Sequence, residues 1–275
     1  MSSKTVARLL KTMKYSLRVN HKRIESGGKN PPSRVVRNRQ FEYISHNRQE
    51  YAHRGIPIVS CDGKKKEQVG NFKNPGTSWQ KEAYEVNDHD FPRDAVGKAI
   101  LFSIYDTLAN EGFVVVGTSH ETPAFAVAAI GLWWKWRGIR RYPNAKELMI
   151  LADSGGANSA RSRAWKYHLQ HDLCDHYHLR VTVCHYPPGA SKWNPADHRL
   201  HSEISKNWAG KPLESYETVL KYLRTTTTET GLSVRARLVR KHYATGERIL
   251  NSQMAQLRLT RHVTNPDWNY TLAPH

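Results

Sequence analysis

Three aspartates in this sequence stand at comparable places. Asp62 closes the apolar run IPIVSCD, Asp153 closes LMILAD, and Asp197 follows the Pro- and Gly-containing loop HYPPGASKWNP. The ends of neighbouring strands meet at one edge of a sheet, so we expect Asp62 and Asp153 to lie close together if their strands pair. Converging carboxylates repel one another unless cations neutralise them, and hard oxygen ligands suit Mg²⁺ or Mn²⁺. Pairs of such ions hold the attacking and leaving oxygens of a phosphoryl transfer, so phosphoryl chemistry is the first hypothesis.

The third acid has two candidates, Asp197 and Glu203, in one expected helix from about 196 to 208. The apolar stripe of this helix is Leu200, Ile204 and Trp208. Asp197 falls on that stripe, whereas Glu203 lies roughly 240° around from Asp197 at 100° per residue. We therefore choose Asp197 and expect His201, one turn later, at the rim of the site.

Each acid also has an ordinary structural interpretation. An Asp at a strand end is commonly a turn former or a helix cap. The glycines after Asp153, Gly155 and Gly156, suggest a phosphate-binding turn, but the sequence has neither GxxxxGK[ST] nor GxGxxG. The alternative is a tight turn in which Asn158 or Ser159 caps the next helix.

Basic and aromatic residues near the acids could contact a polyanion. The candidates for backbone contact are Lys64, Lys65, Arg161, Arg163 and Lys192, although the lysines after Asp62 are equally explained as a solvated charge run. The aromatic group WWKWRG, residues 133–138, could stack on bases, but aromatics at helical spacing more often lie in the core.

A competing metal chemistry is zinc binding by the His- and Cys-rich segment HDLCDHYHLRVTVCH, residues 171–185. Its residue types fit zinc, but its spacing matches neither paired CxxC nor CxxC…HxxxH. Cys184 also ends an expected core strand, where a buried cysteine is common. The oxygen-ligand site is the stronger prediction.

The overall composition points to a nucleic-acid partner. The chain has 275 residues and a formal net charge of +18, with a pI near 9.9. A charge excess of this size indicates a polyanion, with a basic soluble enzyme or a ribosome-associated protein as the alternative. Its three scattered cysteines fit a reducing cytoplasm. No apolar run of membrane-spanning length and no signal peptide is recognised, so we expect no membrane partner.

The pattern around the acids is that of a mixed α/β domain. Strands are expected at 56–62, 68–72, 99–106, 113–118, 148–153 and 179–184. Helices are expected at 3–13, 41–54, about 125–136, about 165–173, 196–208 and 214–226. Together they predict a mixed sheet covered by helices. We divide the chain into a short N-terminal helix region (1–17), a basic linker (18–40), a catalytic domain (41–229) and an unassigned basic extension (230–275).

Several long blocks resemble a known family. PIVSCDGKKKEQVGNFKNPG, ILADSGGANSARSRAWKYHLQ, VCHYPPGASKWNPADHRLHSEISKNWAGKPL and NPDWNYTLAP are similar to the ISAzo-type family of bacterial insertion-sequence transposases, and the similarity extends over essentially the whole chain. This family belongs to the DDE transposases of the retroviral-integrase superfamily, related to the Tc/mariner group. The resemblance implies an RNase H-like mixed five-stranded sheet flanked by helices, with two divalent metal ions, Mg²⁺ or Mn²⁺, per active site.

The resemblance also assigns roles to residues. Its first, second and third acids fall on Asp62, Asp153 and Asp197, the last being Asp where the family usually has Glu. The N-terminal SKTVARLLKTMKYSL resembles the last helix of a helix-turn-helix whose other helices are missing, which suggests a truncated copy. The implied partners are double-stranded DNA, as transposon ends and target, and a second copy of the chain in a synaptic complex. The expected location is the cytoplasm of a bacterium, in association with the nucleoid.

The function expected from the sequence is divalent-metal-dependent DNA cleavage and strand transfer at transposon ends. Two alternatives remain open at this stage. A nuclease of the same fold would use the same acids but only hydrolyse DNA, and a non-catalytic transposase remnant would bind DNA without cleaving it.

Overall fold

The structure is a computed structural model that describes residues 2–16, 31–87 and 92–275. The chain divides into two units, Met1–Pro32 and Ser33–His275. In the first unit, helix α1 (Ser3–Thr12) begins at Ser2, whose hydroxyl accepts a hydrogen bond from the Thr5 N–H, and no residue of α1 is buried. No helix in the described ranges is both long and apolar enough to cross a bilayer.

The second unit is built on one mixed sheet of eight strands in the order β6-β3-β2-β1-β4-β5-β8-β7. The strands are β1 (Ile58–Val69), β2 (Gly97–Asp106), β3 (Glu111–Gly117), β4 (Glu147–Ala152), β5 (Arg180–His185), β6 (Ser233–Val239), β7 (Leu259–Arg261) and β8 (Asn269–Leu272). Strands β1, β2 and β3 pair as an antiparallel meander, whereas β1, β4 and β5 run parallel. The apolar β4 is buried along almost its whole length, as parallel strands covered on both faces are.

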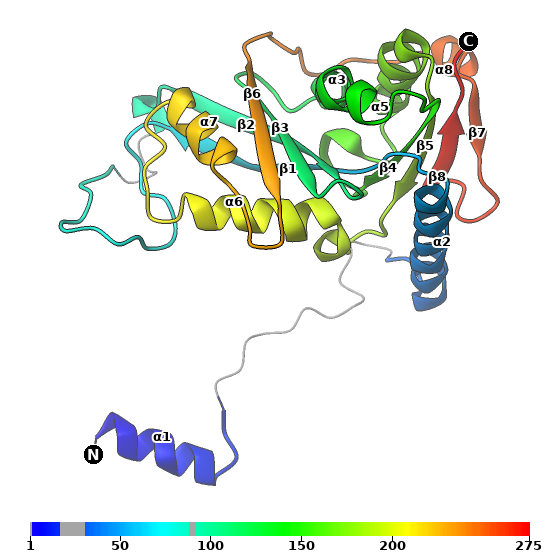
Figure 1. Cartoon of the computed structure of the whole chain (residues 1–275). Helices are drawn as coiled ribbons and strands as arrows, with labels where there is room; N and C mark the ends of the chain where they lie inside the picture. The colour runs from blue at the N-terminus through cyan, green and yellow to red at the C-terminus, as the bar shows by residue number, and fades with distance from the viewer. Residues whose placement is uncertain (1, 17–30, 88–91) are drawn as a thin grey trace. The chain divides into compact units, whose positions relative to one another are not determined.

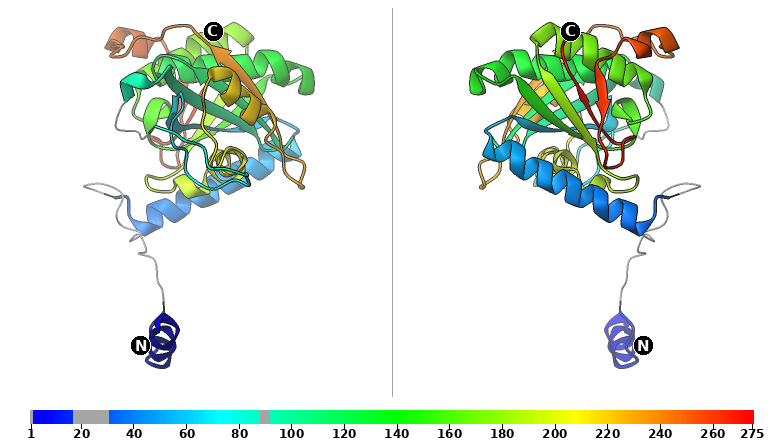
Figure 2. Two further views of the ribbon diagram at one scale, coloured as in Figure 1. Left: turned by 90° about the vertical axis from the view of Figure 1, so that its left-hand side faces the viewer. Right: turned by 90° about the vertical axis from the view of Figure 1, so that its right-hand side faces the viewer.

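Helices cover both faces of this sheet. They are α2 (Arg34–His53), α3 (Pro123–Trp133), α4 (Ile139–Arg141), α5 (Arg163–His168), α6 (Ser202–Asn207), α7 (Tyr216–Arg224) and α8 (Asn251–Ala255). Three helical segments have π geometry, at Trp134–Gly138, Leu169–Asp175 and Ala196–His201, and short 3₁₀ turns lie at Pro92–Asp94, Gly156–Asn158 and Ser191–Trp193. In Figure 1, α3 and α5 lie on one side of the sheet and α6 on the other, and Figure 2 shows α2 as a long helix on the side opposite α3.

The alternation of strand residues explains the two layers. Val59 and Cys61 of β1 join the apolar core under α3 and α5, while Ile58 on the opposite face joins the core under α2. Asp62 has the parity of Ile58, so it belongs to the face that carries α2 and the Ala196–His201 helix. The core therefore fixes the face on which the first acid is presented.

The structure departs from the sequence-based expectations in four places. The two strands expected at 56–62 and 68–72 are one strand, β1, whose pairing with β2 shifts register between Lys64 and Glu67. The charged run KKKE, which lies between the two expected strands, belongs to an irregular stretch of β1. Residues 34–40 of the expected linker belong to α2, and residues 18–30 lie outside the described residues.

The sheet also has eight strands instead of the five that the family resemblance implies, because residues 230–275 complete it. Strand β6 pairs with β3, and β8 inserts between β5 and β7. The segment expected to be an extension therefore contributes both edges of the sheet. The fourth departure is the π geometry that interrupts three of the expected helices.

Candidate active site

Strand pairing places Asp62 and Asp153 side by side. Strands β1 and β4 are parallel, with Cys61 paired to Ala152, and each acid is the next residue of its chain. Strand β4 ends at Ala152, so Asp153 is the first residue after the strand and not its last residue as predicted. Asp62 does not end β1, because this strand continues to Val69 as it pairs with β2. The pairing of β1 with β4, however, ends at Cys61, the residue before Asp62. The two carboxylates therefore meet at the carboxyl end of β4, where ligands of open α/β sheets bind.

Two buried asparagines tie both neighbouring segments to the residue before Asp62. The Asn158 side chain, in the loop after Asp153, donates to the carbonyl of Cys61 (3.2 Å), and the Asn194 side chain donates to the same carbonyl (3.5 Å). The Oδ1 of Asn194 accepts hydrogen bonds from the Ser60 hydroxyl and from the Ala196 N–H. The segments that carry the second and third acids thus share an anchor beside the first.

Asp197 lies in the first turn of the π-helical segment Ala196–His201 and faces the same cleft as the other two acids. This cleft has a volume of about 570 Å³, and Asp62, Asp153 and Asp197 all line it. Glu203, the rejected candidate, forms an ion pair with Lys206 (Nζ–Oε1 2.7 Å) and does not line the cleft. The structure therefore brings together the three acids chosen from the sequence.

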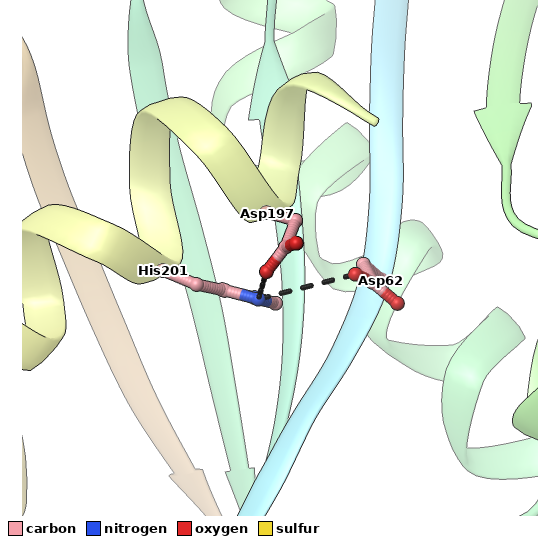
Figure 3. Close-up of side chains that lie close together, drawn as sticks. All are labelled: Asp62, Asp197 and His201. Atoms are coloured by element: carbon pink, nitrogen blue, oxygen red, sulfur yellow. Dashed lines mark ion pairs between the residues drawn. The ribbon is translucent and has the colours of Figure 1, made fainter. Parts of the chain in front are cut away.

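His201 lies inside the site, not at its rim. It is 5% exposed, and its Nε2 is 2.9 Å from the hydroxyl of Ser103, the β2 residue paired with Asp62. Its Nδ1 lies 3.6 Å from Asp197 Oδ1 and 3.9 Å from Asp62 Oδ2. Figure 3 shows the imidazole nitrogen directed at both carboxylates. One potential ligand atom from each of these three residues lies within 4.8 Å of the others.

Burial and mutual repulsion control the charge of the two sheet acids. Burial, followed by the charges of Asp153 and Asp197, raises the pKa of Asp62 to about 8. Burial, together with the charges of Glu121 and Asp197, raises the pKa of Asp153 to about 6, although a hydrogen bond from the Gly155 N–H opposes the shift. A cation placed between these carboxylates would reverse both shifts, so the site fits a positively charged ligand.

Asp197 behaves in the opposite way. The imidazole of His201 is the main cause that lowers the pKa of Asp197 below its usual value. Burial lowers the pKa of His201, because the charged imidazolium is disfavoured away from water. The third acid is therefore the most readily ionised of the three.

A buried polar chain supports the backbone of Asp153. His185 Nδ1 is 2.8 Å from the Asp153 carbonyl, and its Nε2 is 3.2 Å from the hydroxyl of Tyr270 on β8. The indole N–H of Trp165 also donates to the Tyr270 hydroxyl (2.9 Å). Burial lowers the pKa of His185 to about 4, so the ring is neutral and its Nδ1–H donates to the Asp153 carbonyl.

Sequence analysis missed a fourth carboxylate, Glu121, which lies just before α3. Its charge contributes to the raised pKa values of both Asp62 and Asp153, and burial raises its own pKa. An added Cβ at Gly63 would lie 2.2 Å from Glu121 Oε1, so only glycine at that position lets the carboxylate approach β1 beside Asp62. Nothing in the local sequence marks Glu121, because the turn after β3 brings it to the site.

The predicted DNA-contact residues lie in different settings. Lys64 and Lys65 line the cleft, but the Lys64 ammonium is paired with Glu67 (2.7 Å) and lies over the Trp208 ring. Arg161 and Lys192 are exposed. Arg163 instead donates to the Asn251 side chain (2.7 Å) and holds the segment before α8.

The structure bears on three alternatives raised from the sequence: zinc binding by residues 171–185, base stacking by residues 133–138, and a capping role for Asn158 or Ser159. Among the described residues, the group suited to a metal is Asp62, Asp197 and His201, and the segment 171–185 supplies none. Of the aromatic group 133–138, Trp133 and Trp134 are core residues, whereas Trp136 is exposed, with the Arg237 guanidinium over its ring. Helix α5 is capped by Ser162, not by Asn158 or Ser159, and Asp153 Oδ1 accepts from the Gly155 N–H (3.3 Å) as a turn former does. That bond uses one carboxylate oxygen, and Asp153 also lines the cleft.

The donor set of the site fits divalent cations. Several carboxylates converge in a small open cleft, and two have raised pKa values, mainly because they are buried and also because neighbouring carboxylates repel their charge. Hard oxygen donors in this number suit Mg²⁺ or Mn²⁺. Asp62 and Asp153 would share one ion, and Asp62 with Asp197 a second.

Comparisons with known proteins agree with this fold. Two solved structures are similar to it: the Mos1 transposase paired-end complex with left transposon end (TM-score 0.50, 17% identity) and the Mos1 strand transfer complex (TM-score 0.51, 18% identity). Each similarity covers 81% of this chain, which spans about six tenths of the Mos1 chains (62% and 61%). At this level of identity the similarity establishes the RNase H-like fold.

A comparison with curated proteins finds no significant match. The profile of one sequence family, described as the Rhodopirellula transposase DDE domain, matches residues 1–274. The match covers nearly the whole sequence, including all three aspartates of the cleft. The chain therefore belongs to this family of DDE transposases.

Proposed function

We propose that this protein is a DDE/D transposase that cuts DNA at transposon ends and joins the freed ends to target DNA. The observation that carries the proposal is the convergence of Asp62, Asp153 and Asp197 in one cleft of an RNase H-like sheet. The family to which the chain belongs supports the same chemistry. Mg²⁺ or Mn²⁺, two per site, is the proposed cofactor.

The residues of the cleft divide the work of an in-line phosphoryl transfer. When bound, the divalent ions supply the positive charge that activates the attacking oxygen and stabilises the leaving oxygen. Asp62 would be the ligand common to both ions, because its carboxyl is close enough to both Asp153 and Asp197 to feel their charges. The asparagine anchors on the Cys61 carbonyl hold both flanking segments in place, which keeps the reacting atoms aligned.

DNA is the proposed substrate, both as the transposon end and as the target. The net charge of +18 favours phosphate backbones, and Lys65, Arg161 and Lys192 offer exposed positive charge. Joining two ends requires two active sites, so we propose a homodimer in the synaptic complex and action at the bacterial nucleoid. The third acid is Asp; its carboxylate already lines the cleft, so the shorter side chain reaches the site.

The decisive experiment supplies pre-nicked transposon-end DNA and a supercoiled plasmid with Mg²⁺ or Mn²⁺. The proposal predicts joined products. Nicked plasmid without joining would identify a nuclease of the same fold, and salt-sensitive DNA binding without metal-dependent cleavage would identify a binding remnant.

The matched variants are Asp153→Asn and Glu203→Gln. Removing the Asp153 carboxylate, a ligand of one of the two ions, is expected to lower the rate of cleavage by at least about 10³-fold, because charge stabilisation in the transition state is lost. Glu203 lies outside the cleft and pairs with Lys206, so its variant should cleave as the wild type does. Unchanged cleavage in Asp153→Asn would refute the assignment of the site.

A further inference from the structure

His201 is less exposed to solvent than any of the three acids. It is 5% exposed, and its Nε2 lies 2.9 Å from the Ser103 hydroxyl. Ser103 is the cross-strand partner of Asp62, so the imidazole is fixed by the same strand pair that presents the first acid. The ring therefore has one orientation, with Nδ1 directed into the cleft.

The Nδ1 atom of His201 lacks a hydrogen-bond partner at normal distance among the described residues. Its nearest acceptors are Asp197 Oδ1 at 3.6 Å and Asp62 Oδ2 at 3.9 Å, beyond the range of an N–H···O bond. Two atoms bound to one ion at about 2.1 Å lie at most about 4.2 Å apart. Both distances meet that limit, so one ion can contact Nδ1 together with either carboxylate, and ligand atoms of all three residues lie within 4.8 Å of one another.

The hydrogen bonding of the His201 ring also favours a metal ion at Nδ1. In the metal-free protein a proton on Nδ1 can face Asp197 while Ser103 donates to Nε2, which agrees with the lowered pKa of that acid. When Nε2 carries the proton and donates to Ser103 instead, Nδ1 presents a lone pair toward the two carboxylates, and a cation must lie between them. A ring nitrogen whose opposite N–H is hydrogen-bonded is the usual form of a metal-ligating histidine. Ser103 supplies that second hydrogen bond here.

We propose that His201 is a nitrogen ligand of the metal ion held by Asp62 and Asp197, and that it makes this position prefer Mn²⁺ to Mg²⁺. Mg²⁺ takes oxygen ligands and holds its water tightly, whereas first-row transition ions accept imidazole. The inference rests on the proposed metal-dependent function. It goes beyond that function by assigning the two metal positions different ligand chemistry: oxygen only between Asp62 and Asp153, and oxygen plus nitrogen between Asp62 and Asp197.

The test is spectroscopic and does not depend on catalysis. Protein labelled with ¹⁵N-histidine is titrated with Mn²⁺, and electron spin-echo spectroscopy measures the coupling between manganese and nitrogen. The wild type should show a directly bonded nitrogen. The coupling should vanish in His201→Gln and persist in His176→Gln, whose side chain is exposed and lies outside the cleft.

Affinity provides the second readout. The glutamine variant keeps an oxygen donor near the same place, so its affinity for Mn²⁺ should fall by about 10-fold or more while its affinity for Mg²⁺ changes by less than about 3-fold. Ser103→Ala should keep the nitrogen coupling but weaken Mn²⁺ binding by about 10-fold, because the imidazole loses its orienting bond. Circular dichroism checks that each variant is folded.

The possible failures are separable. Mn²⁺ binding by wild-type protein without nitrogen coupling, or no Mn²⁺ binding at all, overturns the inference, and the wild-type spectrum decides this even if a variant fails to fold. Nitrogen coupling without DNA cleavage or joining would leave the ligand assignment standing and refute the proposed function. DNA cleavage and joining by a protein whose manganese spectrum shows no nitrogen coupling would refute the ligand assignment and leave the proposed function standing.

Discussion

The two acids that flank Asp62 are held by different means. Asp153 follows a buried strand, and a chain of buried polar groups through His185 and Tyr270 fixes its backbone. Asp197 lies on a π-helical turn, with a side chain 44% exposed and a histidine beside its carboxylate. Asp153 is positioned by a core strand and buried polar groups, and Asp197 mainly by the hydrogen bonds of the buried Asn194 side chain. The comparison indicates that the Asp153 flank is rigid and that the Asp197 flank depends on a few polar contacts.

The largest expected difference between the two flanks concerns the asparagine anchors. Asn194→Ala removes hydrogen bonds with Ser60, Ala196 and Cys61 at a fully buried position, and should lower the free energy of unfolding by about 2–4 kcal/mol. Asn158→Ala removes one bond to Cys61 and should cost about 1–2 kcal/mol. Urea denaturation measures both. Equal costs would contradict the idea that the Asp197 flank depends more on its anchor.

A second prediction concerns the acid between the flanks. The pKa of Asp62 is raised to about 8 without metal, so the folded state holds a proton that the unfolded state releases near pH 4. Between about pH 4 and 8 this group therefore makes the metal-free protein less stable as pH rises. Asp62→Asn should be more stable than the metal-free wild type, by at least about 1 kcal/mol at pH 8, and the difference should be smaller at pH 5.

Thermal unfolding at the two pH values tests this prediction. Saturating Mn²⁺ should stabilise the wild type more at pH 8 than at pH 5, because protons compete with the ion for Asp62. A stability difference between wild type and variant that does not change with pH would show that Asp62 is ionised at ordinary pH without metal.

The smallest predicted effect compares the flanking acids directly, in metal-free protein at pH 8. The pKa of Asp153 is raised, so its charge is unfavourable in the folded state, and Asp153→Asn should stabilise by about 1 kcal/mol. The pKa of Asp197 is lowered by His201, so Asp197→Asn should destabilise, by no more than about 0.5 kcal/mol because solvent screens this exposed group. Shifts of the same sign in both variants would remove the electrostatic distinction between the flanks.

The sequence predicted the three acids because each stands beside a recognisable apolar pattern. The strand LMILAD and the helical stripe at Leu200 and Ile204 were sufficient to place Asp153 and Asp197. The course of β1 beyond Asp62 was missed because charged residues occupy a strand that pairs irregularly with β2. Glu121 and the inward position of His201 were missed because they depend on how α3 and the Ala196–His201 helix pack against the sheet, and a single sequence does not show that packing.

The strands from residues 230–275 were missed for a different reason. Strand β6 has the sequence SVRARLV, in which exposed arginines alternate with buried apolar residues at the edge of the sheet. Strands β7 and β8 are three and four residues long, too short for a periodic signal. Their places are set by pairing with strands far away in the sequence.

The separation in sequence between these strands and their partners determines the order in which the active site is completed during synthesis. Tyr270 contacts His185 and Trp165, residues 85 and 105 positions earlier, and Asn269 bonds to Gln40 across 229 positions. Contacts over such separations close slowly, and none can form on the ribosome before residues 269 and 270 have emerged. A chain interrupted at residue 260 would carry every acid of the cleft yet lack the layer beneath Asp153. The three aspartates are thus synthesised early, whereas Tyr270, which supports the backbone of Asp153 through His185, is synthesised among the last residues.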